Sequence, residues 1–287
     1  MVKTIGNPLS WAADAAFGTG RTVGAVAGSL GSELTAPPAT NKITTTDIRN
    51  ALRKGVNDFT TFRSDVMFLV AIYPIIGICL AVMAFDMARL PLLFPLAAGF
   101  ALLGPIAAVG LYEMSRQREA GLQVGWGAAL SALRAHIIGP VTVLGLVLLG
   151  IFIAWMFAAS LIYNMTLGPQ PPVSVGKFIF DVATTSAGWM MVILGMGVGF
   201  VFACLVLVIS MVSFPMLIER RAGLPVAVMT SVQVARDNPR TTAIWGLIVA
   251  LAMALGSIPL FLGLIVVLPV LGHATWHLYR AAVPPPE

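Results

Sequence analysis

Long runs of apolar residues constrain this chain more than any other feature. One run, "VTVLGLVLLGIFIAWMFAASLIY", extends from Val141 to Tyr163 without a single charged residue. A helix needs about 20 such residues to cross the hydrocarbon core of a bilayer. Backbone polar groups in lipid must be satisfied within the chain, and runs that do not alternate in polarity favour helices over a barrel. The sequence therefore predicts an all-α membrane protein.

The apolar runs predict six transmembrane helices. We place them at about residues 66–85, 90–112, 137–163, 189–214, 242–257 and 259–279. The last two touch, so we expect a tight turn near Gly256 to Pro259. Only 10% of the residues are charged, against about a quarter in a soluble domain. Residues 1–30 contain no continuous apolar core, so no cleavable signal peptide is expected there.

The distribution of basic residues predicts how the helices are oriented. Fifteen of the 17 Lys and Arg residues lie before span one, between spans two and three, between spans four and five, or after span six. Only Arg89 and Lys177 lie on the other side, where Asp86 and Asp181 are spaced to pair with them. The positive-inside rule then places both termini in the cytoplasm. Because the charges are scattered among aliphatic residues, the sequence argues against a nucleic-acid partner.

Three regions differ in composition: an N-terminal arm (residues 1–41), the six-span membrane domain (42–281) and a short tail (282–287). The arm places Gly20, Gly24 and Gly28 at i, i+4 and i+8, a smooth helical ridge suited to close helix contact. The alternative is that these glycines keep the arm flexible. Trp11 is a candidate for contact with the membrane interface.

The first segment of the membrane domain predicts an amphipathic helix on the cytoplasmic surface. Capping residues open "TTTDIRNALRKGVNDF" at Thr44, and apolar and charged residues then separate at helical spacing. The predicted apolar side carries Ile48, Ala51, Leu52, Val56 and Phe59, and the charged side carries Arg49, Arg53, Lys54 and Asp58.

A short motif, R-x-A-G-L-x-V, occurs twice with a constant offset of 102 residues, each time after a predicted span. Amphipathic sequence follows both copies, so each motif is interpreted as the start of a cytoplasmic interfacial helix. In this interpretation the arginines anchor to head groups, the glycines allow the turn and the leucines begin the buried face: Arg118, Gly121 and Leu122, then Arg220, Gly223 and Leu224. The pattern suggests parallel repeats of one helix and two spans, with chance similarity as the alternative.

Candidates for chemistry are few. Catalysis or ion transport inside a membrane usually needs ionisable residues within the spans, and these spans carry almost none. His136 opens span three, and His273 and His277 share one face of span six. Two histidines are an incomplete shell for zinc, although a haem between His136 and one of the pair is conceivable. We expect interfacial histidines, no catalytic residue, no metal and no cofactor.

The amino-acid sequence of several segments resembles that of a known protein family. "TTDIRNALRKGVNDF", "LPVLGHATWHLYR" and, most specifically, "LLFPLAAGFALLGPIAAVGLYEMSRQREAG" from Leu92 to Gly121 are similar to a family of uncharacterised bacterial membrane proteins, domain of unknown function 2189. The resemblance covers residues 42–281. It implies six spans and a bacterial inner membrane, and it supplies no activity and no functional residues.

These observations favour a non-enzymatic membrane protein that packs against other membrane subunits, as an accessory, assembly or scaffold component of an envelope or respiratory complex. A small-molecule permease is the first alternative, and a polar cavity lined by Tyr163, Asn164 or the Lys177–Asp181 pair would favour it. A haem- or metal-binding protein that uses the three histidines is the second.

Overall fold

The computed structural model describes residues 36–61, 86–102, 104–122, 135–220, 222–259 and 261–285, together with Ile75, Cys79, Val82, Met83 and Val124. Within these residues the chain forms helices and no strands, which confirms the all-α fold class. Most of predicted span one and most of the N-terminal arm, with Trp11, Gly20, Gly24 and Gly28, lie outside the described residues.

The described helices follow the apolar runs. In chain order they are α2 (Thr45–Thr61), η1 (Leu90–Leu92), α5 (Leu93–Leu102), α6 (Gly104–Ala107), α7 (Val109–Glu119), α9 (Ala135–Thr166), α10 (Val175–Thr184), α11 (Ser186–Ser210), α12 (Ser213–Glu219), α13 (Leu224–Asp237), α14 (Pro239–Ser257) and α15 (Leu264–Ala282).

Three stretches of the described chain are long and apolar enough to cross a membrane: Ile137–Thr166, Ser186–Glu219 and Pro239–Ser257. They correspond to predicted spans three, four and five, and Leu90–Gly99 is a shorter apolar helix. The protein is therefore an integral membrane protein, and the number of six spans stays a prediction.

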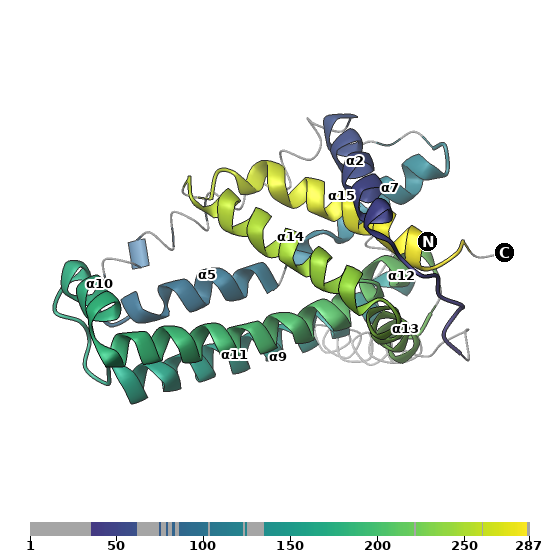
Figure 1. Ribbon diagram of the computed structural model, residues 1–287. Coiled ribbons are helices and arrows are strands. Elements are labelled where there is room, and N and C mark those ends of the chain that lie inside the picture. The colour runs from purple at the N-terminus through teal and green to yellow at the C-terminus, as the bar shows by residue number, and fades with distance from the viewer. Residues whose placement is uncertain are drawn as a thin grey trace, which may run out of the picture.

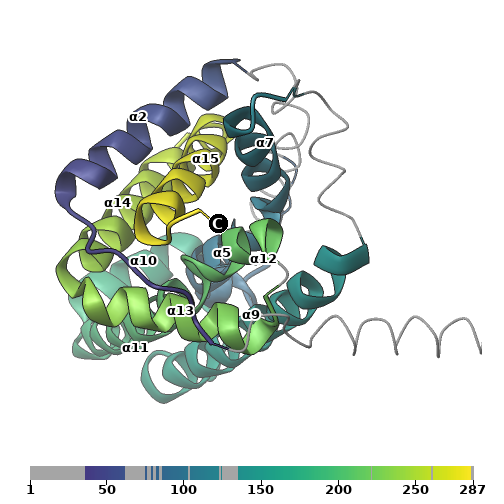
Figure 2. The same ribbon diagram turned by 90° about the vertical axis from the view of Figure 1, so that its right-hand side faces the viewer.

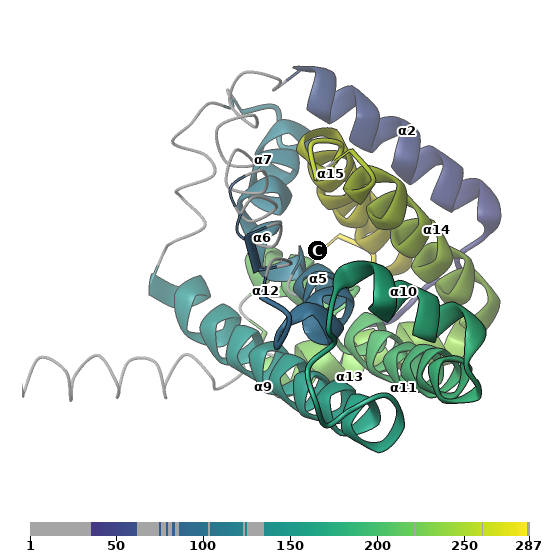
Figure 3. The same ribbon diagram turned by 90° about the vertical axis from the view of Figure 1, so that its left-hand side faces the viewer.

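The molecule is elongated and its two ends differ (Figure 1). The long helices α9 and α11 pack together, and α10 lies across one end of them. The C-terminal end of the chain, α2, α12 and α13 gather at the opposite end, which Figure 2 views face-on and Figure 3 views from the other side. We call these the α10 end and the α2 end.

Helix α2 packs closely on α15. Its buried residues are Ile48, Ala51, Gly55 and Asp58. A Cβ atom at Gly55 would lie 2.7 Å from both the Ala274 nitrogen and the Val270 oxygen, so the two backbones approach more closely there than another residue permits. The face that the sequence predicted is therefore rotated: Asp58 is buried, and Val56 is 48% exposed.

This difference has a physical cause. Polarity alone placed Asp58 on the solvent side of the predicted helix, but a carboxylate can be buried when neighbouring helices supply hydrogen-bond donors. The prediction for Asp58 and Val56 was wrong because those donors belong to distant segments of the sequence.

The turn between α14 and α15 falls slightly later than predicted. Helix α14 ends at Ser257, and α15 begins at Leu264 rather than at residue 259. A Cβ atom at Gly263 would lie 2.8 Å from the Gly256 Cα, so two facing glycines let the helices meet closely at this turn. Phe261 has a φ of 65° within it.

The two copies of the R-x-A-G-L-x-V motif form different turns. Gly121 has a φ of 72°, where other residues are strained, and it ends α7. Gly223 is extended (φ −68°, ψ 157°) and precedes α13. Residues 125–134, where the first copy predicts an interfacial helix, lie outside the described residues. Leu122 is exposed and Leu224 is partly buried.

The close approach at Gly55 gives a stability prediction. Gly55→Ala should lower the unfolding free energy by about 1–3 kcal/mol, because the new methyl group must displace the backbone of α15. The matched control is Gly176→Ala in α10, where an added Cβ meets nothing within 4 Å. The control should raise stability by up to about 1 kcal/mol through helix propensity. Thermal unfolding in mild detergent measures both, and equal behaviour of the two variants would contradict the packing.

Candidate functional site

A buried polar cluster joins three helices at the α2 end. It consists of Asp58 in the last turns of α2, Ser115 and Arg118 on α7, and His273 and His277 on α15. Asp58 is 3% exposed, Ser115 is 1% exposed and His273 is fully buried. Ser115 and Arg118 are spaced i, i+3 on α7, so they share one face of that helix. His273 and His277 are spaced i, i+4 and share one face of α15, and both faces point toward the carboxylate of Asp58.

The Asp58 carboxylate is the centre of the cluster. Ser115 Oγ donates a hydrogen bond to Asp58 Oδ2 at 2.6 Å, and His277 Nε2 lies 2.9 Å from the same oxygen. Arg118 Nη1 donates to Oδ1 at 2.6 Å. Oδ2 therefore contacts one group from α7 and one from α15, and Oδ1 binds a second group from α7. The single side chain of Asp58 connects α2 to both helices.

His273 reaches the carboxylate through the serine. Its Nδ1 lies 2.8 Å from Ser115 Oγ and 4.0 Å from Asp58 Oδ2. A serine hydroxyl carries one proton. When Ser115 donates that proton to Asp58, Oγ accepts from His273, which then carries a proton on Nδ1. A fully buried histidine is thus linked to a partly exposed one, His277, through Ser115 and Asp58.

The surroundings keep Asp58 ionised at neutral pH. Burial alone raises the pKa of its carboxyl group, but the hydrogen bonds from His277 and Ser115 and the nearby charge of both histidines lower it. The net effect is a pKa below the ordinary value. The negative charge is also balanced by Arg118, so the buried carboxylate is compensated as buried charges require.

The arrangement does not present a nucleophile. Serine hydrolases also combine a serine, a histidine and a carboxylate, but there the histidine accepts the serine proton. Here Ser115 Oγ lies 2.6 Å from the carboxylate itself, and the residue is 1% exposed. The cluster is therefore suited to holding helices together and to binding protons rather than to attacking a substrate.

The structure brings together two of the three predicted histidines. His273 and His277 lie in the cluster, whereas His136 lies in the first turn of α9 and its side chain is outside the described residues. Among the residues that the structure describes, no group of three or more His, Cys, Asp or Glu side chains is arranged to hold a metal ion.

A second polar group, the terminal ion-pair network, connects the ends of three helices. Arg280 Nε donates to Glu119 Oε2 at 3.0 Å, and Arg280 Nη1 donates to Glu219 Oε1. Trp276 Nε1 donates to Glu119 and the Tyr279 hydroxyl donates to Glu219. The C-terminal part of α15 is therefore fixed to the ends of α7 and α12.

Both arginines of the repeated motif have partners inside the protein. Arg118 binds Asp58, and Arg220 lies 3.5 Å from Glu219 and donates to the Pro284 carbonyl oxygen. The sequence predicted contacts with lipid head groups for these two side chains. It missed Asp58 as the partner of Arg118, because that contact is set by tertiary packing, whereas Glu219 directly precedes Arg220 in the sequence.

One sequence signal could have located the cluster. Ile48, Ala51, Gly55 and Asp58 follow the spacing i, i+3, i+7 and i+10, one stripe of a helix. Had Gly55 been taken as a site of close helix contact, Asp58 would have been placed on the buried face.

Residues 92–219 match the model of a family described as "Predicted integral membrane protein (DUF2189)". The predicted resemblance is confirmed for this part of the chain, which includes Ser115 and Arg118 but not Asp58, His273 or His277. No curated protein and no solved structure matches the chain.

The shared carboxylate gives a prediction about stability and pH. Asp58→Asn should lower the unfolding free energy by about 1–3 kcal/mol at neutral pH, because it removes the charge that binds Arg118. Since the folded-state pKa of Asp58 is lowered, its contribution is present above its unfolded pKa of about 3.9. The contribution is lost as the pH falls through the folded-state pKa.

Thermal unfolding of both proteins as a function of pH measures this effect. The difference between wild type and variant should be present at neutral pH and should narrow as the pH falls below about 4. The control is Asp86→Asn, in an exposed pair with Arg89, which should cost less than about 1 kcal/mol. A pH-independent difference would refute the role of the Asp58 charge.

Proposed function

We propose that this protein is a non-enzymatic accessory or scaffold subunit of a bacterial inner-membrane complex, and that it packs against other membrane subunits through one face of α11. The observation that carries the proposal is the low burial of this helix. Only 6% of the most apolar window of Ser186–Glu219 is buried within the chain, against 33% for Ile137–Thr166.

The exposed face of α11 has the shape of a helix-packing surface. Ile193, Phe200 and Val201 are 65–69% exposed and surround Gly197 at spacings of three or four residues. An added Cβ at Gly197 meets nothing within 4 Å. Lipid covers large apolar side chains as well as a protein does, but a glycine between them creates a notch that lets a second helix approach closely.

The α2 end supports the same function by fixing the point where the N-terminal arm joins the membrane domain. Asn41 N donates to the Ala282 oxygen at 2.8 Å, and Ile43 N donates to Asn238 Oδ1 at 2.7 Å. Thr241 Oγ1 donates to the Ile43 oxygen at 2.9 Å. The segment that leads out of the arm is therefore attached to α14 and to the end of α15. A rigid attachment point is what an arm that contacts a partner needs.

The alternatives gain less support from the geometry. A permease was expected to have a polar cavity near Tyr163, but the hollow that Tyr163 lines is apolar, and its hydroxyl group donates to the Gln170 oxygen. The haem or metal alternative competes with the existing contacts of His273 and His277. An optical spectrum and metal analysis of the purified protein test it directly.

The packing face gives a prediction with a matched control on the same helix. A photocrosslinking residue at position 193 should form an adduct with another membrane subunit in native membranes. Gly197→Leu should reduce that adduct at least tenfold, because leucine fills the notch. Position 195 lies about 200° around the helix from position 197, so Gly195→Leu should leave the adduct unchanged. Mass spectrometry identifies the partner, and a protein that is never crosslinked to another subunit would refute the proposal.

The proposed orientation, with both termini in the cytoplasm, is tested by cysteine labelling. Cys79 and Cys204 are replaced first. A membrane-impermeant thiol reagent should label Val173→Cys, which is 89% exposed in the wild type, in intact spheroplasts. Gln233→Cys on α13, at the α2 end, should react only after the membrane is opened. The reverse pattern would overturn the orientation that the basic residues predict.

A further inference from the structure

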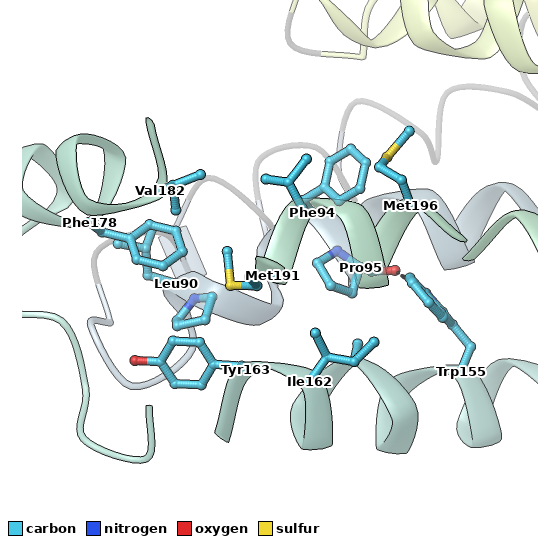
Figure 4. Close-up of a pocket in the computed structure, with 14 residues that line it drawn as sticks. Leu90, Phe94, Pro95, Trp155, Ile162, Tyr163, Phe178, Val182, Met191 and Met196 are labelled. Atoms are coloured by element: carbon cyan, nitrogen blue, oxygen red, sulfur yellow. Dashed lines mark hydrogen bonds between the residues drawn. The ribbon is translucent and has the colours of Figure 1, made fainter. Parts of the chain in front are cut away.

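An apolar hollow of about 360 Å³ lies at the α10 end, between η1, α5, α9, α10 and α11 (Figure 4). Its lining includes Phe94, Trp155, Ile162, Tyr163, Phe178 and Met191. This volume is within the range of ligand pockets. The hollow is separate from the buried polar cluster, which lies at the other end of the molecule.

The lining offers an occupant mainly hydrocarbon and aromatic surface. Trp155 Nε1 donates to the Pro95 oxygen at 2.8 Å, and the Tyr163 hydroxyl donates to the Gln170 oxygen at 2.6 Å. The polar atoms of the two amphipathic side chains are thus already bonded within the protein. A water molecule in such a space would lack the two to four polar partners that it needs. The hollow therefore selects an apolar occupant.

The depth of the hollow matches one leaflet of a bilayer. Tyr163 lies less than one turn from the end of α9 at Thr166, and Trp155 lies 11 residues from that end. At 1.5 Å per residue this distance is about 16 Å. Half of the hydrocarbon core is about 15 Å thick. The lining therefore spans a length close to half of the hydrocarbon core, which is the length that a single acyl chain occupies in one leaflet.

The edge of the hollow carries cations at the level of the head groups. Lys177 precedes Phe178 of the lining, and Arg89 precedes Leu90, which also lines the hollow. Their side chains are 57% and 62% exposed, and each is paired with a carboxylate, Asp181 or Asp86. Such pairs complement a zwitterionic head group, whose phosphate and ammonium can bind one member of each pair.

Helix α10 is held in place over this edge. Phe178 and Val182 lie one turn apart and both line the hollow. A Cβ atom at Gly188 would lie 2.3 Å from the Asp181 oxygen and 2.5 Å from the Val182 Cα, so the start of α11 fits tightly against the end of α10. The hollow is a feature of the packed structure rather than of a loose loop.

We propose that this hollow binds one acyl chain of a zwitterionic phospholipid from the leaflet at the α10 end, with the head group beside Lys177 and Arg89. Gly195 contributes to the site because it lines the hollow and an added Cβ there meets nothing within 4 Å. The glycine leaves the room that the chain occupies.

The test uses the full-length protein in vesicles of phosphatidylethanolamine and phosphatidylglycerol. A phosphatidylethanolamine with a diazirine in its acyl chain is the probe, and peptide mass spectrometry locates the adducts after irradiation. We expect adducts on Trp155, Ile162 and Met191 in the wild type. Gly195→Leu, which fills the hollow, should reduce them at least fivefold, whereas Gly197→Leu on the opposite side of α11 should retain them.

Three results would overturn the proposal. The first is equal labelling of these residues in Gly195→Leu and wild type. The second is labelling of the wild type that spreads evenly over α9 and α11, as for bulk lipid. The third is labelling by a free fatty acid carrying the same diazirine but not by the phospholipid. This proposal is tested separately from the proposed packing of α11 against another subunit. Gly195→Leu is the disruptive variant here and the control there, and Gly197→Leu is the reverse.

Discussion

The packing at the α2 end depends on one buried carboxylate. Removing a charge from water is costly unless other groups replace the lost hydrogen bonds. Asp58 meets this condition only where α7 supplies Ser115 and Arg118 and α15 supplies His277. The carboxylate therefore specifies a single arrangement of three helices that apolar contacts alone would not fix. Gly55, one turn before Asp58, also fixes the position of α2 along α15. The two backbones approach this closely only at the glycine, where no side chain lies between them.

The two ends of the molecule use opposite chemistry. At the α2 end, charged side chains pair with one another between helices, and Arg280 connects Glu119 at the end of α7 to Glu219 at the end of α12. At the α10 end, the space between the helices is lined by hydrocarbon, and the charged pairs lie outside it. Buried and partly buried ion pairs therefore fix the helices at the α2 end, whereas an apolar space separates them at the α10 end.

Sequence patterns predicted the helices and ion pairs that form within one segment, and they missed the contacts that form between distant segments. The apolar run from Val141 to Tyr163 became one long helix, because a bilayer permits little else. The i, i+3 pair of Asp86 with Arg89 and the i, i+4 pair of Lys177 with Asp181 formed as their spacing predicts. By contrast, Asp58 and Val56 exchanged faces, since the donors to Asp58 lie 57 to 219 residues further along the chain. The hollow was equally unpredictable, because five helical elements line it and none of them indicates a space by itself.

The repeated motif gains a physical meaning from these contacts. Arg118 and Arg220 occupy the same position in the two copies. Each lies at or just after the end of a helix that follows an apolar segment, and each contacts a carboxylate. Arg280 follows the last apolar segment and binds the carboxylates at the ends of both earlier helices. Arg118 and Arg220 therefore share a position in the motif but not a kind of partner, because Arg118 binds the buried Asp58 of α2 whereas Arg220 lies beside its sequence neighbour Glu219.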